Sequence, residues 1–264
     1  MLLDANLSIL FTELPLLDRP QAARRAGFDA VEFWWPFDTA EPKPAEVDAF
    51  VDALDAAGVK LVGLNFFAGD MPTGDRGLVS WPNRQAEFNA SVEIAVDIAR
   101  RTGCRTFNAL YGNRVAGFTP SEQDELATAN LTVAATAVQA VDGTIVLEPL
   151  SGAPDNPLRT AADALAVADQ VPLDNVALLC DLYHLAVNGD DLDIVTTKHI
   201  ERIGHVQFAD APGRGEPGSG QLELLRHLTT LAANGYRGHV GAEYRPTGAT
   251  ADSFGWLSQF MEAL

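Results

Sequence analysis

The sequence predicts a single (β/α)₈ barrel, and three observations point to it. Short apolar runs alternate with longer amphipathic runs along the chain, and strict alternation indicates a parallel sheet. Eight such pairs occupy 264 residues, a length at which an α/β sheet commonly closes into a barrel. No Gly-x-Gly-x-x-Gly motif follows the first apolar run, which argues against an open, doubly wound sheet. Since no Gly/Ser-rich linker divides the chain, we expect residues 1–264 to form one domain.

The apolar runs predict eight short, buried strands, and the amphipathic runs between them predict helices. The segment 44–57, for example, places Val47, Phe50, Val51 and Leu54 at helical spacing. The strands are predicted to begin near Leu3, Ala30, Lys60, Cys104, Thr144, Val176, Ile203 and His239. The helices are predicted over residues 17–25, 44–57, 81–101, 121–139, 160–170, 191–201, 222–233 and 252–264.

Residues typical of helix ends support these boundaries. Gly58 and Gly103 each follow a helical run, where a residue with left-handed backbone is expected. Thr119 followed by Pro120 is typical of a helix start, with threonine as the N-cap and proline in the first turn.

Composition excludes several classes of function. Acidic residues outnumber basic ones 36 to 18, for a net charge of −18, so nucleic acid is not an expected partner. No apolar run reaches the roughly 18 residues of a membrane span, and no signal peptide is visible. Cys104 and Cys180 fall within predicted strands as buried, unpaired residues. We therefore expect a cytoplasmic protein.

Four oxygen-bearing side chains stand at the ends of the last four predicted strands: Glu148, Asp181, Gln207 and Glu243. In a barrel, the C-terminal strand ends surround the active site, so these side chains are expected to converge. Buried carboxylates repel one another unless a cation neutralises them. Carboxylate and amide oxygens suit a hard divalent ion such as Mg²⁺ or Mn²⁺. The four residues are therefore predicted to be the ligands of one metal ion.

Other polar residues at the predicted barrel mouth are candidates for substrate contacts. His184, in a loop three residues after Asp181, is expected to donate a hydrogen bond to a substrate oxygen. Arg214 and Arg76, on loops after the seventh and third strands, are candidates for holding a substrate carboxylate. Arg245, two residues past Glu243, is expected instead to pair with a nearby acid.

Trp34 and Trp35 follow the second predicted strand. They suit two roles that the sequence does not separate: walls of a pocket that exclude water, or packing against a second subunit of a homo-oligomer.

Several segments together resemble the hydroxypyruvate isomerase family of xylose-isomerase-like barrels, which includes 2-oxo-tetronate isomerases. The resemblance runs from near the N-terminus to about residue 256. It is carried by Ala5-Asn6-Leu7-Ser8, Ala26-Gly27-Phe28-Asp29-Ala30-Val31-Glu32-Phe33, Ala68-Gly69-Asp70, Leu147-Glu148-Pro149, Asp181-Leu182-Tyr183-His184, Gly204-His205-Val206-Gln207, Arg214-Gly215-Glu216-Pro217-Gly218 and Gly241-Ala242-Glu243-Tyr244-Arg245-Pro246.

The resemblance implies an aldose–ketose type isomerisation of a small oxo-acid, most directly hydroxypyruvate to tartronate semialdehyde. It implies that Glu148 and Glu243 are the paired acid and base, and that they also bind the metal with Asp181 and Gln207. His184 matches a position that touches substrate oxygens in related sugar epimerases, as does Arg214.

Three alternatives remain open at this point. One is an isomerase of 2-oxo-tetronate or a 3-epimerase of ketoses on the same scaffold. Another is a phosphodiesterase of the endonuclease type, although five histidines, mostly away from the strand ends, and a net charge of −18 argue against it. The last is a sugar-acid binding protein without catalytic activity.

Overall fold

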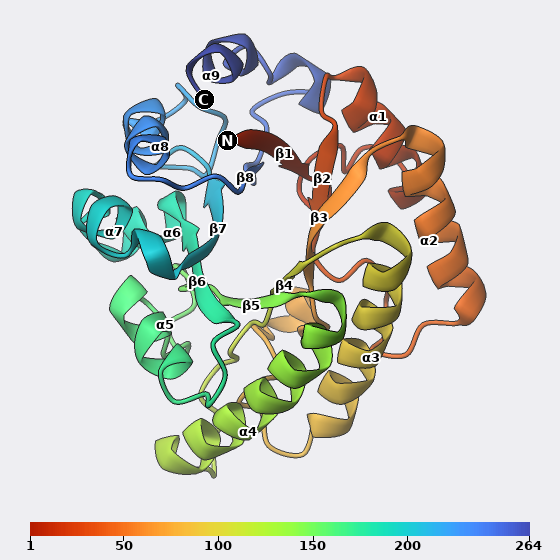
Figure 1. Ribbon diagram of the computed structural model, residues 1–264, viewed down its shortest axis with the longest axis vertical. Helices are drawn as coiled ribbons and strands as arrows, with labels where there is room; N and C mark the ends of the chain where they lie inside the picture. Colours follow the sequence, from red (N-terminus) through yellow and green to blue (C-terminus); the bar gives the residue numbers. More distant parts are fainter.

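The computed structural model describes residues 1–264, and its sheet is a closed barrel of eight parallel strands that follow one another in chain order (Figure 1). The last strand pairs with the first and so completes the barrel. The strands are β1 (Leu2–Asn6), β2 (Ala30–Phe33), β3 (Lys60–Asn65), β4 (Thr106–Asn108), β5 (Thr144–Leu147), β6 (Val176–Asp181), β7 (Ile203–Phe208) and β8 (His239–Ala242). The predicted fold class is confirmed.

Helices surround the barrel on its outer side (Figure 1). The α-helices are α1 (Arg19–Arg25), α2 (Pro44–Ala57), α3 (Gln85–Thr102), α4 (Pro120–Val138), α5 (Ala161–Ala168), α6 (Leu182–Asn188), α7 (Leu192–Lys198), α8 (Leu224–Ala233) and α9 (Leu257–Ala263). Short 3₁₀ helices are η1 (Leu16–Asp18), η2 (Met71–Thr73), η3 (Gln139–Val141), η4 (Ile200–Arg202) and η5 (Thr250–Asp252). No helix combines the length and the apolar composition that crossing a lipid bilayer requires.

The predicted helix ends have the expected local chemistry. Thr119 accepts a hydrogen bond from the backbone of Glu122, whose side chain in turn accepts one from the Thr119 backbone, so a capping box starts α4. Gly58 and Gly103 follow α2 and α3 in the left-handed conformation. Because a side chain disfavours this conformation, glycine is well suited to both positions.

Several predicted boundaries were wrong, among them the start of the last helix, which is Leu257 rather than residue 252. The fourth strand begins at Thr106, so Cys104 lies in the turn before it, although its side chain is buried. The third helix begins at Gln85 rather than at Trp81. The left-handed backbone of Asn83, at φ 67°, interrupts the helical path, since a helix requires negative φ.

The connection between β6 and β7 also differs from the prediction, because it holds two α-helices instead of one. The additional helix, α6, starts directly where β6 ends. His184 therefore lies in the first turn of a helix, not in a loop. This placement fixes its backbone relative to Asp181, the last residue of the strand.

The barrel interior is unusually polar. Core positions of such barrels are generally filled by bulky aliphatic residues, but here β1, β2 and β7 bury Asp4, Asn6, Glu32, His205 and Gln207. Most of the apolar core lies instead between the sheet and the helices. Among these polar residues, Asn6 and Gln207 connect the interior to the cavity at the C-terminal strand ends, since both donate hydrogen bonds to Glu243.

Candidate active site

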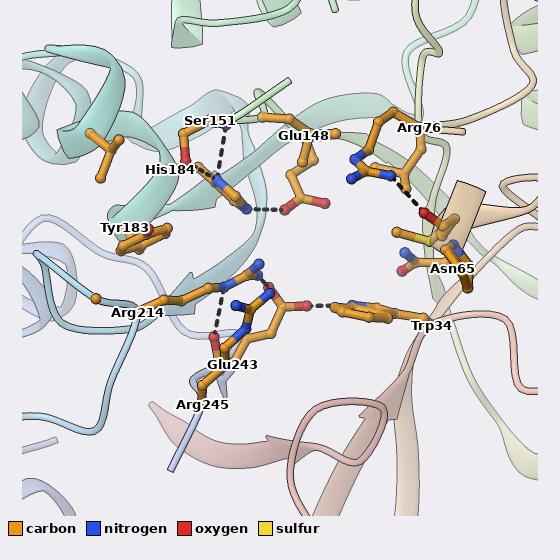
Figure 2. A pocket seen from close by; sticks show the side chains of 17 residues that line it. Trp34, Asn65, Arg76, Glu148, Ser151, Tyr183, His184, Arg214, Glu243 and Arg245 are labelled. Atoms are coloured by element: carbon orange, nitrogen blue, oxygen red, sulfur yellow. Dashed lines mark hydrogen bonds and ion pairs between the residues drawn. The ribbon is translucent and has the colours of Figure 1, made fainter. Parts of the chain in front are cut away.

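A cavity of about 550 Å³ opens at the C-terminal ends of the strands (Figure 2). Its walls include Trp34, Glu148, His184, Arg214 and Glu243. These side chains come from the segments after β2, β5, β7 and β8 and from α6. This is the end of the barrel where enzymes of this architecture carry their active sites.

The acidic residues predicted to converge do so. One oxygen each from Glu148, Asp181 and Glu243, and one ring nitrogen of His184, lie within 4.8 Å of one another. Gln207 joins the group, since its Nε2 lies 3.4 Å from Glu243 Oε1. All of these side chains are buried.

The two carboxylate oxygens of Asp181 have different contacts. Oδ1 accepts hydrogen bonds from the backbone N–H groups of Tyr183, at 2.7 Å, and His184, at 3.1 Å, and so caps α6. Oδ2 is buried and has no hydrogen-bond partner. Because an unpartnered buried carboxylate oxygen is costly, this atom is suited to accept a cation or a hydrogen-bond donor.

Burial and mutual repulsion raise the pKa of the two glutamates. For Glu148 the pKa lies well above its usual range because of burial, to which the charges of Glu243 and Asp181 add. For Glu243 burial raises the pKa to about 7, and the guanidinium of Arg214 opposes that rise. A carboxylate with a pKa near 7 is suited to exchanging protons with a substrate at neutral pH.

His184 has a defined tautomer. The backbone N–H of Ser151 donates to its Nδ1 at 3.0 Å, so in the neutral ring the proton is on Nε2. Burial lowers the pKa of His184 to about 4, and the ring is neutral at pH 7. Nε2 lies 3.6 Å from Glu148 Oε1 (Figure 2). It also lies 3.7 Å from Asp181 Oδ2. It therefore presents an N–H donor to the cavity rather than a lone pair for a metal.

The three arginines at the mouth have different partners. Arg214 binds the Glu243 carboxylate, lies 4.0 Å from Asp181 Oδ2 and packs over the Tyr183 ring. Arg76 donates from one nitrogen to the carbonyls of Met71 and Asp75, at 3.0 and 2.6 Å. The predicted ion pair of Arg245 was wrong: this exposed residue lines the cavity and forms no ion pair. Glu243, the acid two residues before it, is paired with Arg214 instead.

The two tryptophans after β2 have different surroundings and different hydrogen-bond partners. Trp34 lines the cavity, and its Nε1 donates to Glu243 Oε1 at 2.6 Å (Figure 2). Trp35 Nε1 instead donates to the backbone carbonyl of Thr39 at 2.8 Å. Trp34 is therefore a wall of the site and a partner of Glu243.

The residues fit a hard divalent cation. Besides Asp181 Oδ2, the buried Oε1 of Gln207 has no hydrogen-bond partner. Glu148 and Glu243 add carboxylates beside Asp181, and oxygen donors of this kind suit Mg²⁺ or Mn²⁺. Glu148, Asp181, Gln207 and Glu243 would hold such an ion, and His184 would remain outside the ligand set.

Several residues that shape the site were not singled out from the sequence. Asn108 donates to Glu148 Oε2 at 2.7 Å, and Asn6 donates to Glu243 Oε1 at 2.8 Å. Ser151 sets the tautomer of His184, and Glu32 contacts Gln207 at 2.7 Å. Period-two alternation along the strands marks Asn6 and Glu32 as inward-facing, but it does not identify their partners.

Comparison with known proteins places the chain among relatives of similar length. Residues 20–260 match the family model described as xylose isomerase-like TIM barrel. A Streptomyces coelicolor protein named "Putative hydroxypyruvate isomerase" is 50% identical over 263 residues, which cover 96% of this chain and 94% of that protein. The 2-oxo-tetronate isomerase of Haemophilus influenzae is 33% identical over 97% of this chain and 98% of its own length.

A solved structure from Brucella melitensis, titled as an AP endonuclease of family 2, superimposes with a TM-score of 0.88. It is 32% identical and is matched over 98% of this chain and 99% of its own.

Proposed function

The chain belongs to the xylose isomerase-like TIM barrel family and is an isomerase, and from this premise we propose that it interconverts hydroxypyruvate and tartronate semialdehyde. One observation carries the proposal: the buried Glu148 and Glu243 line one cavity, and one oxygen of each lies within 4.8 Å of the other and of an oxygen of Asp181. That arrangement suits the transfer of a proton between two adjacent carbons of a small oxo-acid.

A divalent ion held by Glu148, Asp181, Gln207 and Glu243 would polarise the oxygens of the substrate and stabilise negative charge on them. The protein groups then account for the movement of hydrogen. One glutamate removes a proton from the hydroxymethyl carbon of hydroxypyruvate, leaving an enediolate. Return of a proton to the former carbonyl carbon, by the same glutamate or the opposite one, together with transfer of the terminal hydroxyl proton to the former carbonyl oxygen, gives tartronate semialdehyde.

Glu148 and Glu243 can share this work because they follow β5 and β8 and face one another across the cavity (Figure 2). A positioned acid or base typically contributes about 10²–10⁴-fold to rate. The Nε2–H of His184 would donate to the developing alkoxide. No redox cofactor is required, since the hydrogen moves within one molecule.

The substrate carboxylate requires a cation at the mouth. Arg76 is held in place by two backbone carbonyls through one nitrogen, so its remaining donors are available to a carboxylate. Arg214 already forms an ion pair with Glu243. It would contact the substrate only if its N–H groups donated to the substrate and to Glu243 at the same time. Arg76 is therefore the better-placed partner, with Arg214 contacting substrate oxygens beside Glu243.

The variant Glu243→Gln tests the proton transfer. Exchange of the substrate's carbon-bound hydrogen with solvent deuterium, followed by NMR, should slow by about 10²–10⁴-fold because an amide cannot accept the proton. Glu41→Gln, a change at a surface acid without an ion pair, serves as the matched control and should exchange at the normal rate. Unchanged exchange in Glu243→Gln would remove this residue from the mechanism.

Metal removal tests the ligand set separately. Extended dialysis against a chelator should abolish turnover, and Mn²⁺ or Mg²⁺ should restore it. Full activity of protein shown by elemental analysis to be free of metal would contradict the role assigned to the ion.

A second candidate, isomerisation of 2-oxo-tetronate, is favoured by the relative from Haemophilus influenzae that carries that name. The cavity of about 550 Å³ has room for a fourth carbon and its hydroxyl. A panel of hydroxypyruvate, 2-oxo-tetronates and ketoses, compared by kcat/KM, separates the two candidates. Preference for ketoses without a carboxylate would argue for an epimerase instead.

The site does not support nuclease chemistry, although the Brucella melitensis structure carries an endonuclease title. Such chemistry requires several histidines around zinc ions and a basic groove for phosphates. Here one histidine reaches the cluster and its available nitrogen carries a proton, while the chain has a net charge of −18.

A further inference from the structure

We propose that Glu32 is a positioning residue that aims the side-chain oxygen of Gln207 at the metal site. This inference rests on the metal ligands assigned under the proposed function. Glu32 is buried in the barrel interior at 3% exposure, below the cavity and outside the predicted ligand set. None of its atoms lines the cavity where the substrate would bind, so its effect would be exerted through Gln207.

The first step concerns the orientation of the Gln207 amide. Its Nε2 donates to Glu32 Oε1 at 2.7 Å, while its Oε1 is buried without a hydrogen-bond partner. An ionised carboxylate only accepts hydrogen bonds. Rotating the amide by 180° would bring its oxygen against Glu32, so the carboxylate selects the orientation that leaves Oε1 free to bind a cation.

The second step concerns what holds Glu32 itself. Its Oε1 also accepts from Asn6 Nδ2 at 3.1 Å, and its Oε2 lies 2.6 Å from His205 Nε2. Two glycines form the walls of its slot: a Cβ on Gly241 would lie 2.5 Å from Oε1, and one on Gly63 would lie 3.0 Å from Oε2. Bound by three donors and enclosed on two sides, the carboxylate has a fixed position.

The third step extends the same network to a second ligand. Asn6 Nδ2 donates both to Glu32 and to Glu243 Oε1. Glu32 thus orients Gln207 directly and holds the asparagine that supports Glu243. Partners of metal ligands typically contribute about 10- to 100-fold to metal affinity, and this is the scale expected for Glu32.

The experiment measures Mn²⁺ affinity of the purified full-length protein by calorimetry or electron paramagnetic resonance, without substrate. Glu32→Gln should raise the Kd for Mn²⁺ about 10- to 100-fold, because residue 32 then accepts either orientation of the Gln207 amide. Asp4→Asn is the matched control. Asp4 lies within 4.8 Å of Glu32 and His205, so this variant reports on a change of charge in the same cluster that leaves the Glu32–Gln207 hydrogen bond in place. Glu41→Gln, the same substitution at an exposed carboxylate, is a second control, and its Kd for Mn²⁺ should change less than about threefold.

A reciprocal exchange makes the test specific to amide orientation. In Gln207→Glu, two carboxylates would face each other, whereas in Glu32→Gln/Gln207→Glu the new amide at position 32 can donate to the carboxylate introduced at position 207. Glu32→Gln should therefore weaken Mn²⁺ binding in the natural background and strengthen it in the Gln207→Glu background. A role confined to stability would not reverse sign in this way.

The outcomes separate the inference from its premise. If the unaltered protein does not bind Mn²⁺, the proposed metal site fails, and the role of Glu32 fails with it. If the unaltered protein binds Mn²⁺ and Glu32→Gln has the same Kd, only the role of Glu32 is overturned. If Glu32→Gln does not fold, Glu32→Asp replaces it, because the shorter side chain withdraws the carboxylate from Gln207 while keeping the charge. An unchanged Kd for Mn²⁺ in Glu32→Asp would equally overturn the inference.

Discussion

Replacing Gly241 with alanine tests the slot that holds Glu32. The added Cβ would lie 2.5 Å from Glu32 Oε1 and 2.8 Å from its Cδ. Carbon–oxygen contacts normally begin at about 3.3 Å, so the carboxylate must retreat by roughly 1 Å. Such a shift would lengthen its hydrogen bonds to Gln207 and Asn6, which measure 2.7 and 3.1 Å.

The expected loss of stability follows from these contacts. Overpacking of a filled core costs about 1–3 kcal/mol. Loss of hydrogen bonds to a charged group costs about 1.5–3 kcal/mol in addition. Alanine recovers about 0.5–1 kcal/mol because glycine is intrinsically unfavourable in a strand. We therefore expect the free energy of unfolding to fall by about 2–5 kcal/mol, which corresponds to a decrease in Tm of about 4–20 °C.

Urea denaturation with chelator present measures this change without a contribution from bound metal. Gly248→Ala is the matched control, because that glycine is exposed, lacks positive φ and has no atom within 4 Å of the added Cβ. Its stability should change by less than about 1 kcal/mol. Equal unfolding midpoints for the two variants would refute the packing argument around Glu32.

Three further outcomes are expected. Burial raises the pKa of Glu243 to about 7 and that of Glu148 well above its usual range, so Mn²⁺ binding should release protons and become tighter as pH rises from about 6 to 8. Calorimetry in buffers of different ionisation enthalpy should reveal the proton release, and identical heats in all buffers would contradict it. His184→Asn should keep the Kd for Mn²⁺ within about threefold while lowering kcat about 10²–10³-fold, whereas a large loss of metal affinity would make this histidine a ligand. Arg214→Lys should lower kcat/KM about 10- to 100-fold through the loss of charge-assisted hydrogen bonds worth about 1.5–3 kcal/mol, and a kinetic assay that shows no decrease would exclude the guanidinium from the reaction.

The barrel could be predicted because its signals are local. Apolar runs, helical spacing and glycines at helix ends each depend on neighbouring residues, and the strand order follows from the rule that consecutive parallel strands pair. The convergence of Glu148, Asp181 and Glu243 followed from the same rule, since each stands at a strand end. The structure brings these acids together as that reasoning requires.

Other parts of the site depend on partners that local patterns do not identify. Glu32 and Gln207 are separated by 175 positions in the sequence, and alternation predicts only that both face inward. Helix α6 was not predicted because it has seven residues, which is fewer than two helical turns. It also begins directly after β6, with no loop to mark the boundary. Arg214 was predicted to hold a substrate carboxylate, and local patterns did not indicate that the fold places its guanidinium against Glu243.

The hydrogen bond between Asn6 and Glu243 joins residues 237 positions apart, and it has a consequence for biosynthesis. A nascent polypeptide that has left the ribosome only as far as β7 contains Glu148, Asp181 and Gln207 but lacks Glu243, and the slot for Glu32 lacks its Gly241 side. With the ligand set proposed above, a cation could be bound only when translation has delivered β8 and this strand has docked beside β1. Until that late step, the growing chain exposes the unpaired edge of an incomplete sheet. Chaperone protection matters most at this stage, because such edges are prone to aggregation.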